Sequence, residues 1–149
     1  MNRAPEGAGP DRLILHASCV TLADRALLIT GPSGAGKSEL ALRLIALGAV
    51  LVSDDRTELA MAGGRLMARC PSPAIRGLIE ARGVGLLRAD TVEIAPVALV
   101  ADLARDETAR LPPERNITIL GKQLPLVLRV QNDHFPAALL LYLKNARQD

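Results

Sequence analysis

The chain has 149 residues, enough for one domain with a hydrophobic core of its own, and a formal net charge of only +2. Hydrophobic residues make up 49% of the sequence and aromatic residues 1%, so the core must consist of Leu, Val, Ile and Ala. The small charge and the scarcity of aromatic rings argue against a nucleic-acid partner and against a membrane partner. Cys19 and Cys70 lie far apart in the sequence, which favours two buried thiols over a disulfide framework.

We expect residues 1–12 to form a flexible tail, because they are polar, rich in Gly and Pro, and lack the apolar stretch of a secretion signal. Residues 13–149 are expected to form a single domain. No stretch of the sequence has the length and apolar character of a membrane span. Together with the two cysteines that show no disulfide pattern, these features predict a cytoplasmic protein.

The first half of the domain predicts strands around one helix. Residues 13–22 and 26–30 predict two antiparallel strands. Apolar residues at helical spacing predict a helix over residues 37–47, with Gly48 as its C-terminal cap. Residues 49–52 then predict a buried strand.

The second half predicts two hairpins, a strand between them and a closing helix. The hairpins are expected over residues 57–69 and 117–130, each turning at a pair that contains glycine. The strand is expected over residues 91–103 and the helix over residues 135–147. Because strands outnumber helices, the expected fold class is α/β, with a mixed sheet rich in antiparallel strands and few helices.

A complete P-loop, G-x-x-x-x-G-K-[ST], occupies residues 31–38, between a predicted strand and a predicted helix. Its glycines let the backbone wrap around phosphate, so that several N–H groups and the N-terminus of the helix point at the anion. Lys37 is expected to reach the β- and γ-phosphates and Ser38 to offer its hydroxyl to Mg²⁺. We therefore predict that ATP or a related nucleotide binds with Mg²⁺. The expected nucleotide-binding residues are Gly31, Pro32, Ser33, Gly34, Ala35, Gly36, Lys37 and Ser38.

Acidic groups near the phosphates must decide which reaction follows. Asp54 and Asp55 come directly after the strand predicted over residues 49–52, which we expect to lie beside the strand that leads into the P-loop. Two neighbouring carboxylates there could hold Mg²⁺ through water, and one of them could accept a proton from an attacking hydroxyl. Because side chains alternate along a strand, only one of the two is expected to face the phosphates; a solvated turn or a helix N-cap is the alternative. Glu80 is flanked by apolar residues and needs a partner, either Mg²⁺ or Arg82. A lone histidine on an apolar strand, such as His16, is by itself more typical of a structural residue.

Four blocks of the sequence together resemble the C-terminal catalytic domain of the HPr kinase/phosphorylase family. The blocks are His16, GPSGAGKSELALRLIALGA, LVSDD and LIEARGVGLL. They correspond in order and spacing to the family's H-G, G-x-S-G-x-G-K-S-E-x-A-L, A-D-D and E-x-R-G-x-G-[IL], over roughly residues 13–90. The resemblance implies a P-loop kinase fold of the HPr kinase/PEP carboxykinase type. It also implies an ATP-dependent protein-serine kinase that acts on HPr, the phosphocarrier protein of the phosphotransferase system.

The resemblance also implies a role for each matching residue. Asp55 corresponds to the acceptor of the proton from the serine hydroxyl and Lys37 to the phosphate-binding catalytic residue. Ser38 and Glu80 correspond to the Mg²⁺ ligands, and His16 to a further catalytic-site residue. We also expect a homo-oligomer.

The resemblance is weaker after residue 90. The family's G-R-N stretch has no counterpart, which leaves open whether the chain carries out phosphorolysis, and Arg115 is the candidate for the family's C-terminal arginine. Two other functions stay open: a kinase of the same fold with a different substrate, and a nucleotide-binding sensor that transfers no phosphate.

Overall fold

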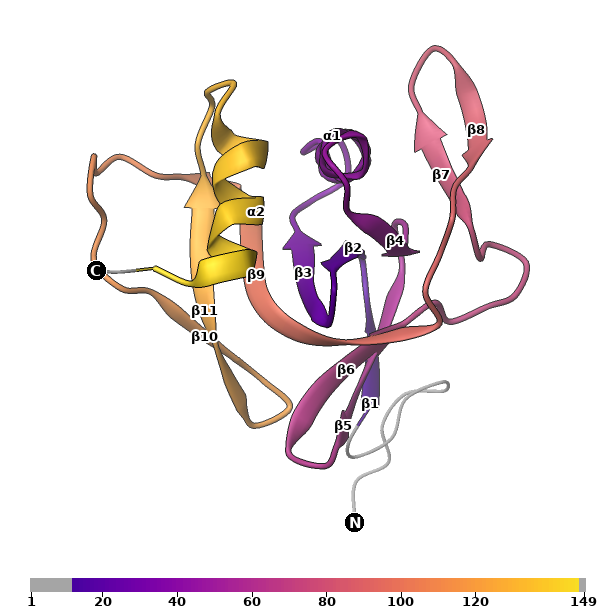
Figure 1. Ribbon diagram of the computed structural model, residues 1–149, viewed down its shortest axis with the longest axis horizontal. Helices are drawn as coiled ribbons and strands as arrows, with labels where there is room; N and C mark the ends of the chain where they lie inside the picture. Colours follow the sequence, from indigo (N-terminus) through magenta and orange to yellow (C-terminus); the bar gives the residue numbers. More distant parts are fainter. Residues whose placement is uncertain (1–11, 148–149) are drawn as a thin grey trace.

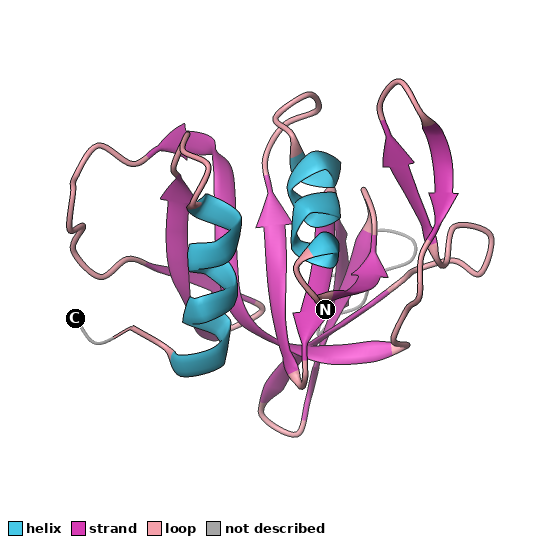
Figure 2. Cartoon of the chain, turned by 45° about the horizontal axis from the view of Figure 1, so that its top comes forward, coloured by secondary structure: helices cyan, strands magenta, loops and turns pink. Residues whose placement is uncertain are grey.

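The computed structural model describes residues 12–147 as a bent mixed sheet, a separate hairpin and two helices (Figure 1; Figure 2). This confirms the predicted fold class. Residues 1–11 of the predicted tail lie outside the described residues, and Arg12 belongs to the first strand. In chain order the elements are β1 (Arg12–Leu15), β2 (Ala17–Leu22), β3 (Arg25–Thr30), α1 (Lys37–Ala46), β4 (Val50–Ser53), β5 (Thr57–Ala62), β6 (Arg65–Arg69), β7 (Leu78–Ala81), β8 (Gly85–Arg88), β9 (Ile94–Asp106), β10 (Asn116–Ile119), β11 (Lys122–Arg129) and α2 (Phe135–Asn145).

The long strand β9 joins the two parts of the sheet. Its start pairs antiparallel with β6, and β6 continues through β5 to β1. The rest of β9 pairs in parallel with β3 on one side and with β11 on the other, and β3 continues through antiparallel β2 to β4. Figure 1 shows β9 bending between the two parts. The sheet therefore folds over on itself and encloses a core.

The central strands bury side chains on both faces. Cys19 and Leu28 face the part of the sheet formed by β5 and β6, whereas Val20 and Leu27 face the helices, and all four are fully buried. Burial on both faces explains why these strands are almost continuously apolar in sequence. Cys19 and Cys70 are buried free thiols, as expected, and burial raises the pKa of Cys19.

Both helices cover the same face of the sheet (Figure 2). The predicted helix over residues 37–47 is confirmed as α1, and Gly48, with φ 113°, follows its end. The apolar residues that the helices bury against the strands recur at helical spacing: Leu40, Ala41 and Leu44 in α1, and Phe135, Leu139 and Leu143 in α2. No helix among the described residues is long and apolar enough to cross a membrane.

Two predictions about the strands are wrong. Residues 13–22 are not one strand, because the chain breaks at His16: β1 pairs with β5 in one part of the sheet, whereas β2 pairs with β3 and β4 in the other. The strand before Asp54 does not adjoin the strand of the P-loop, because β2 lies between β4 and β3. The two hairpins, over residues 57–69 and 117–130, are confirmed as β5–β6 and β10–β11.

Candidate active site

The P-loop connects β3 to α1, so the strand before it and the helix after it that the motif requires are both present. Gly31, Gly34 and Gly36 have φ values of 147°, 84° and 99°, which allow the backbone to curl at the N-terminus of α1. Gly31 is also confined, since a Cβ there would lie 3.2 Å from the Cβ atoms of Ala35 and Leu103. The loop thus has the backbone conformation of an anion cradle at the positive end of a helix.

The ammonium group of Lys37 lies inside this loop. Its Nζ donates hydrogen bonds to the carbonyl oxygens of Gly31, at 2.8 Å, and Pro32, at 3.1 Å, and the residue is only 6% exposed. The fixed positive charge is therefore in contact with the loop that the motif assigns to phosphate. A group held in this way can neutralise phosphate charge with little rearrangement.

Asp54 lies at the centre of the site and connects four segments of the chain. Its Oδ1 accepts hydrogen bonds from the hydroxyls of Ser38 and Ser18, both at 2.7 Å, and its Oδ2 accepts one from the backbone N–H of Glu80 at 3.2 Å. Asp54 is only 8% exposed, so these donors compensate the burial of its charge. Asp54 thereby ties the end of β4 to α1, β2 and the β7–β8 hairpin.

The side chain of Asp55 is open to solvent and forms no hydrogen bond with Ser38. Its side chain is 61% exposed, and its Oδ1 lies 3.7 Å from Nδ1 of His16. Its backbone has φ 67°, a left-handed conformation that costs energy for most residues, and its N–H donates to the hydroxyl of Ser18. Asp55 thus presents an open carboxylate beside an imidazole, within one residue of the buried carboxylate that contacts the P-loop.

Glu80 lies on β7, next to Asp54 through its backbone, with its side chain exposed. Among the described residues its carboxylate forms no ion pair, so the alternative of a salt bridge with Arg82 is not observed. The same part of the chain holds no group of three or more His, Cys, Asp or Glu side chains arranged to bind a metal ion. Mg²⁺ often binds through one or two carboxylates together with phosphate oxygens and water. The hydroxyl of Ser38 and the backbone N–H of Glu80 both donate to Asp54, so the two residues lie on either side of the same carboxylate.

Arg115 does not approach these groups. It forms a bidentate ion pair with Glu107, with both N–O distances 3.0 Å, and lines a different cavity. This guanidinium holds the pKa of Glu107 below its usual value. The arginine from the C-terminal part of the chain that lies in a pocket beside the P-loop is Arg129, which bonds Asp106 at 2.7 Å.

Residues 10–93 match the family model described as the HPr Serine kinase C-terminal domain, more than half of the chain. The chain belongs to the HPr kinase C-terminal domain family. It is 38% identical over 122 residues to the HPr kinase/phosphorylase of Burkholderia lata, which covers 74% of this chain and 38% of that protein. It is 41% identical over 75 residues to the HPr kinase/phosphorylase of Alkaliphilus metalliredigens, covering 50% of this chain and 24% of that protein. The chain thus spans well under half the length of these relatives.

A solved member of the HPr kinase family has the same fold. The Hpr(Ser) kinase/phosphatase from Coxiella burnetii superposes with a TM-score of 0.74 at 26% sequence identity, over 89% of each chain. The resemblance identified from the sequence is therefore confirmed, and it extends in structure well beyond residue 90.

For this member of the HPr kinase family, sequence reasoning left the choice between two site residues open and missed a third. Alternation along a strand indicated that one of Asp54 and Asp55 faces the P-loop, and Asp54 is the one that contacts Ser38. Ser18 was missed altogether. It lies two residues after His16, on a strand whose position beside β4 depends on long-range pairing, so no local motif signals it.

Proposed function

We propose that this chain is an ATP-dependent protein-serine kinase that phosphorylates an HPr-type phosphocarrier protein. The observation that carries the proposal is an exposed carboxylate, Asp55, that follows directly on Asp54, which hydrogen-bonds the P-loop serine at 2.7 Å. A P-loop alone supports nucleotide binding, whereas a free carboxylate beside it supports proton removal from an acceptor hydroxyl. Membership of the HPr kinase family favours a serine of HPr as that acceptor.

In the proposed reaction, residues 31–38 bind the phosphates of ATP and Lys37 neutralises charge on the transferred group. The serine oxygen of the acceptor bonds to the γ-phosphorus, the bond from that phosphorus to the β,γ-bridging oxygen breaks, and ADP leaves. Asp55 accepts the proton of the serine hydroxyl. Nδ1 of His16 lies 3.7 Å from Oδ1 of Asp55, so the imidazole is placed to share that proton with the carboxylate.

We propose that Ser38 and Glu80 hold Mg²⁺ in this reaction, with Asp54 orienting the Ser38 hydroxyl. The metal would supply charge neutralisation at the phosphate oxygens. Asp54 is hydrogen-bonded to three protein donors, which favours an orienting role for it over direct coordination.

The experiment that tests the proposal mixes the purified chain with γ-labelled ATP, Mg²⁺ and HPr from the same organism. Label on a serine of HPr supports the kinase. Label on a different acceptor from the same cells, with HPr unlabelled, would favour a kinase of another substrate. Binding of ATP with no transfer to any acceptor would favour a sensor.

Three further properties belong to the same proposal. The relatives are named kinase/phosphorylase, and in the phosphorolysis reaction inorganic phosphate would take the phosphoryl group from phosphoserine to give pyrophosphate, while Asp55 returns the proton. Pyrophosphate release from phospho-HPr tests this property. We also propose a homo-oligomer, tested by sedimentation, and a cytoplasmic location, tested by cell fractionation.

A further inference from the structure

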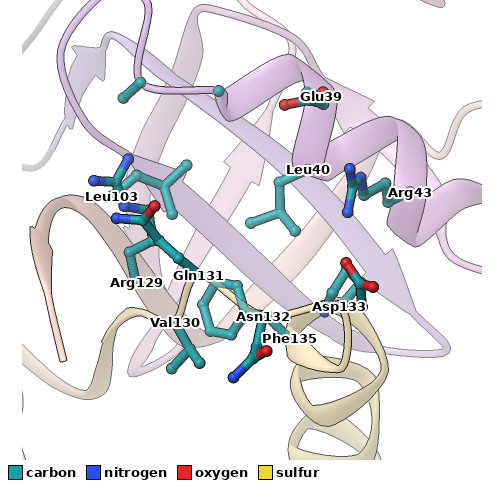
Figure 3. A pocket seen from close by; sticks show the side chains of 13 residues that line it. Glu39, Leu40, Arg43, Leu103, Arg129, Val130, Gln131, Asn132, Asp133 and Phe135 are labelled. Atoms are coloured by element: carbon teal, nitrogen blue, oxygen red, sulfur yellow. The ribbon is translucent and has the colours of Figure 1, made fainter. Parts of the chain in front are cut away.

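A pocket of about 310 Å³ opens directly beside the P-loop (Figure 3). It is bordered by Ala35 and Gly36 of the loop, by α1, by the end of β9 and by residues 129–133, 135 and 136. Its volume is at the small end of the range for ligand pockets, which suits one nucleoside better than a larger group. We refer to it as the loop-side pocket.

The loop-side pocket lies across the P-loop strand from the acidic groups. In the sheet, β3 has β2 and then β4 on one side, which bring Ser18 and Asp54, and β9 and then β11 on the other. Leu103 at the end of β9 lines the pocket. If the γ-phosphate lies at Ser38 and Asp55, the nucleoside at the other end of ATP must lie away from β2 and β4. The loop-side pocket lies on the β9 side of β3, which is the side opposite to those two strands.

The floor of the loop-side pocket is apolar. Leu40, Leu103 and Phe135 line it with exposed fractions of 7%, 4% and 6%, and Figure 3 shows Leu40 and Phe135 turned toward the pocket from the two helices. Phe135 is the single phenylalanine of the chain. A buried aromatic ring with aliphatic neighbours is a surface against which a flat heterocycle packs well.

The rim of the loop-side pocket is polar but balanced in charge. It carries two carboxylates, Glu39 and Asp133, and two guanidinium groups, Arg43 and Arg129 (Figure 3). A lining of this kind favours a neutral group over a further phosphate. The rim also includes Asn132, an amide with both a donor and an acceptor, which forms no side-chain hydrogen bond with other described residues and so is available to the edge of a base.

We propose that the loop-side pocket binds the nucleoside of ATP, with the base packed against Phe135 and its edge at Asn132. This inference rests on the proposed function, because it requires the phosphates to occupy residues 31–38. It assigns nucleoside recognition to the C-terminal part of the chain, outside the four sequence blocks that carry the family resemblance.

The test compares the dissociation constants of ATP and of tripolyphosphate, both with Mg²⁺, by calorimetry. Tripolyphosphate carries the phosphate chain without a nucleoside, so the ratio of the two constants measures what the nucleoside adds. We expect the wild type to bind ATP at least about tenfold more tightly than tripolyphosphate. Phe135→Leu and Asn132→Ala should each reduce this advantage about fivefold and leave tripolyphosphate binding unchanged.

Asn116→Ala is the matched control, because Asn116 is exposed on β10 and lies outside the pocket. It should alter neither constant. Equal affinity of the wild type for both ligands, or equal weakening of both by the two pocket variants, would overturn the inference while the proposed function survives. A wild type that binds neither ligand would overturn the proposed function and this inference together.

Discussion

The hydroxyl of Ser38, at the start of α1, lies 2.7 Å from a carboxylate oxygen of Asp54, at the end of β4. Ser38 follows the P-loop strand β3 and Asp54 follows β4, and these two strands are not neighbours in the sheet, because β2 lies between them. Ser18, on the intervening strand β2, donates to the same oxygen of Asp54, also at 2.7 Å. In the proposed reaction the two carboxylates have different roles: Asp54 holds the hydroxyl of Ser38, and Asp55 accepts the proton of the acceptor serine.

Asp54→Ala should destabilise the fold strongly. It would leave the hydroxyls of Ser18 and Ser38 and the N–H of Glu80 without their acceptor in a largely buried position. We expect the free energy of unfolding to fall by about 2–4 kcal/mol, measured by urea denaturation. Asp24→Ala, at the exposed turn between β2 and β3, is the control and should change stability by less than about 0.5 kcal/mol. A loss no larger than that of the control would mean that Asp54 does not hold the site together.

Asp55 should show the cost of its left-handed backbone. At φ 67°, glycine is less strained than alanine, so Asp55→Gly should be more stable than Asp55→Ala by about 1 kcal/mol. Both variants remove the carboxylate, so thermal unfolding of the pair isolates the backbone effect. The same exchange at Asp90, an exposed residue without a positive φ, should give no advantage to glycine. Equal stability of Asp55→Gly and Asp55→Ala would show that the left-handed backbone at this position costs no energy.

Gly31→Ala should weaken nucleotide binding as well as the fold. An added Cβ would lie 3.2 Å from Ala35 and Leu103, so the loop has to shift to make room for it. Gly63→Ala is a matched control, because Gly63 also has a positive φ but open space around it. We expect both variants to lose about 1–2 kcal/mol of stability, and Gly31→Ala alone to raise the dissociation constant of ATP, by about tenfold or more. ATP binding that is equally affected in the two variants would contradict the confined geometry of the loop.

The ion pair of Glu107 with Arg115 should make stability depend on acid pH. Arg115 lowers the pKa of Glu107 in the folded chain from the ordinary value of 4.5, so the stabilising contribution is complete above that value and is lost as pH falls through the lower folded pKa. Urea denaturation between pH 6 and pH 3 should therefore show a shallower loss of stability for Glu107→Gln than for the wild type. Glu114→Gln, at an exposed position, is the control and should follow the wild type. Parallel curves for Glu107→Gln and the wild type would contradict the assignment.

Much of the fold follows from local patterns in the sequence. The helix after the P-loop and the two hairpins are set by helical spacing and by glycine turns, which are local, and they were predicted correctly. The break of the first strand at His16 was not, because an alternating pattern cannot show that β1 and β2 pair in different parts of the sheet.

The sequence predicts those parts of the site that belong to a local motif. The P-loop is local, whereas the bond between Asp54 and Ser38 depends on the order of strands, which no motif encodes. The same limit applies to Arg115, whose carboxylate partner Glu107 lies across a proline-containing loop and holds it away from the P-loop.

The most direct test of the different roles of Asp54 and Asp55 is a phosphate-transfer assay of the Asp55→Asn variant. The assay measures the transfer of labelled phosphate from saturating ATP to a serine of HPr. Asparagine tolerates the left-handed backbone and removes only the proton acceptor. We predict an unchanged dissociation constant for ATP and a transfer rate lower than that of the wild type by a factor on the order of 100 to 10,000. Transfer by Asp55→Asn at the wild-type rate would contradict the account.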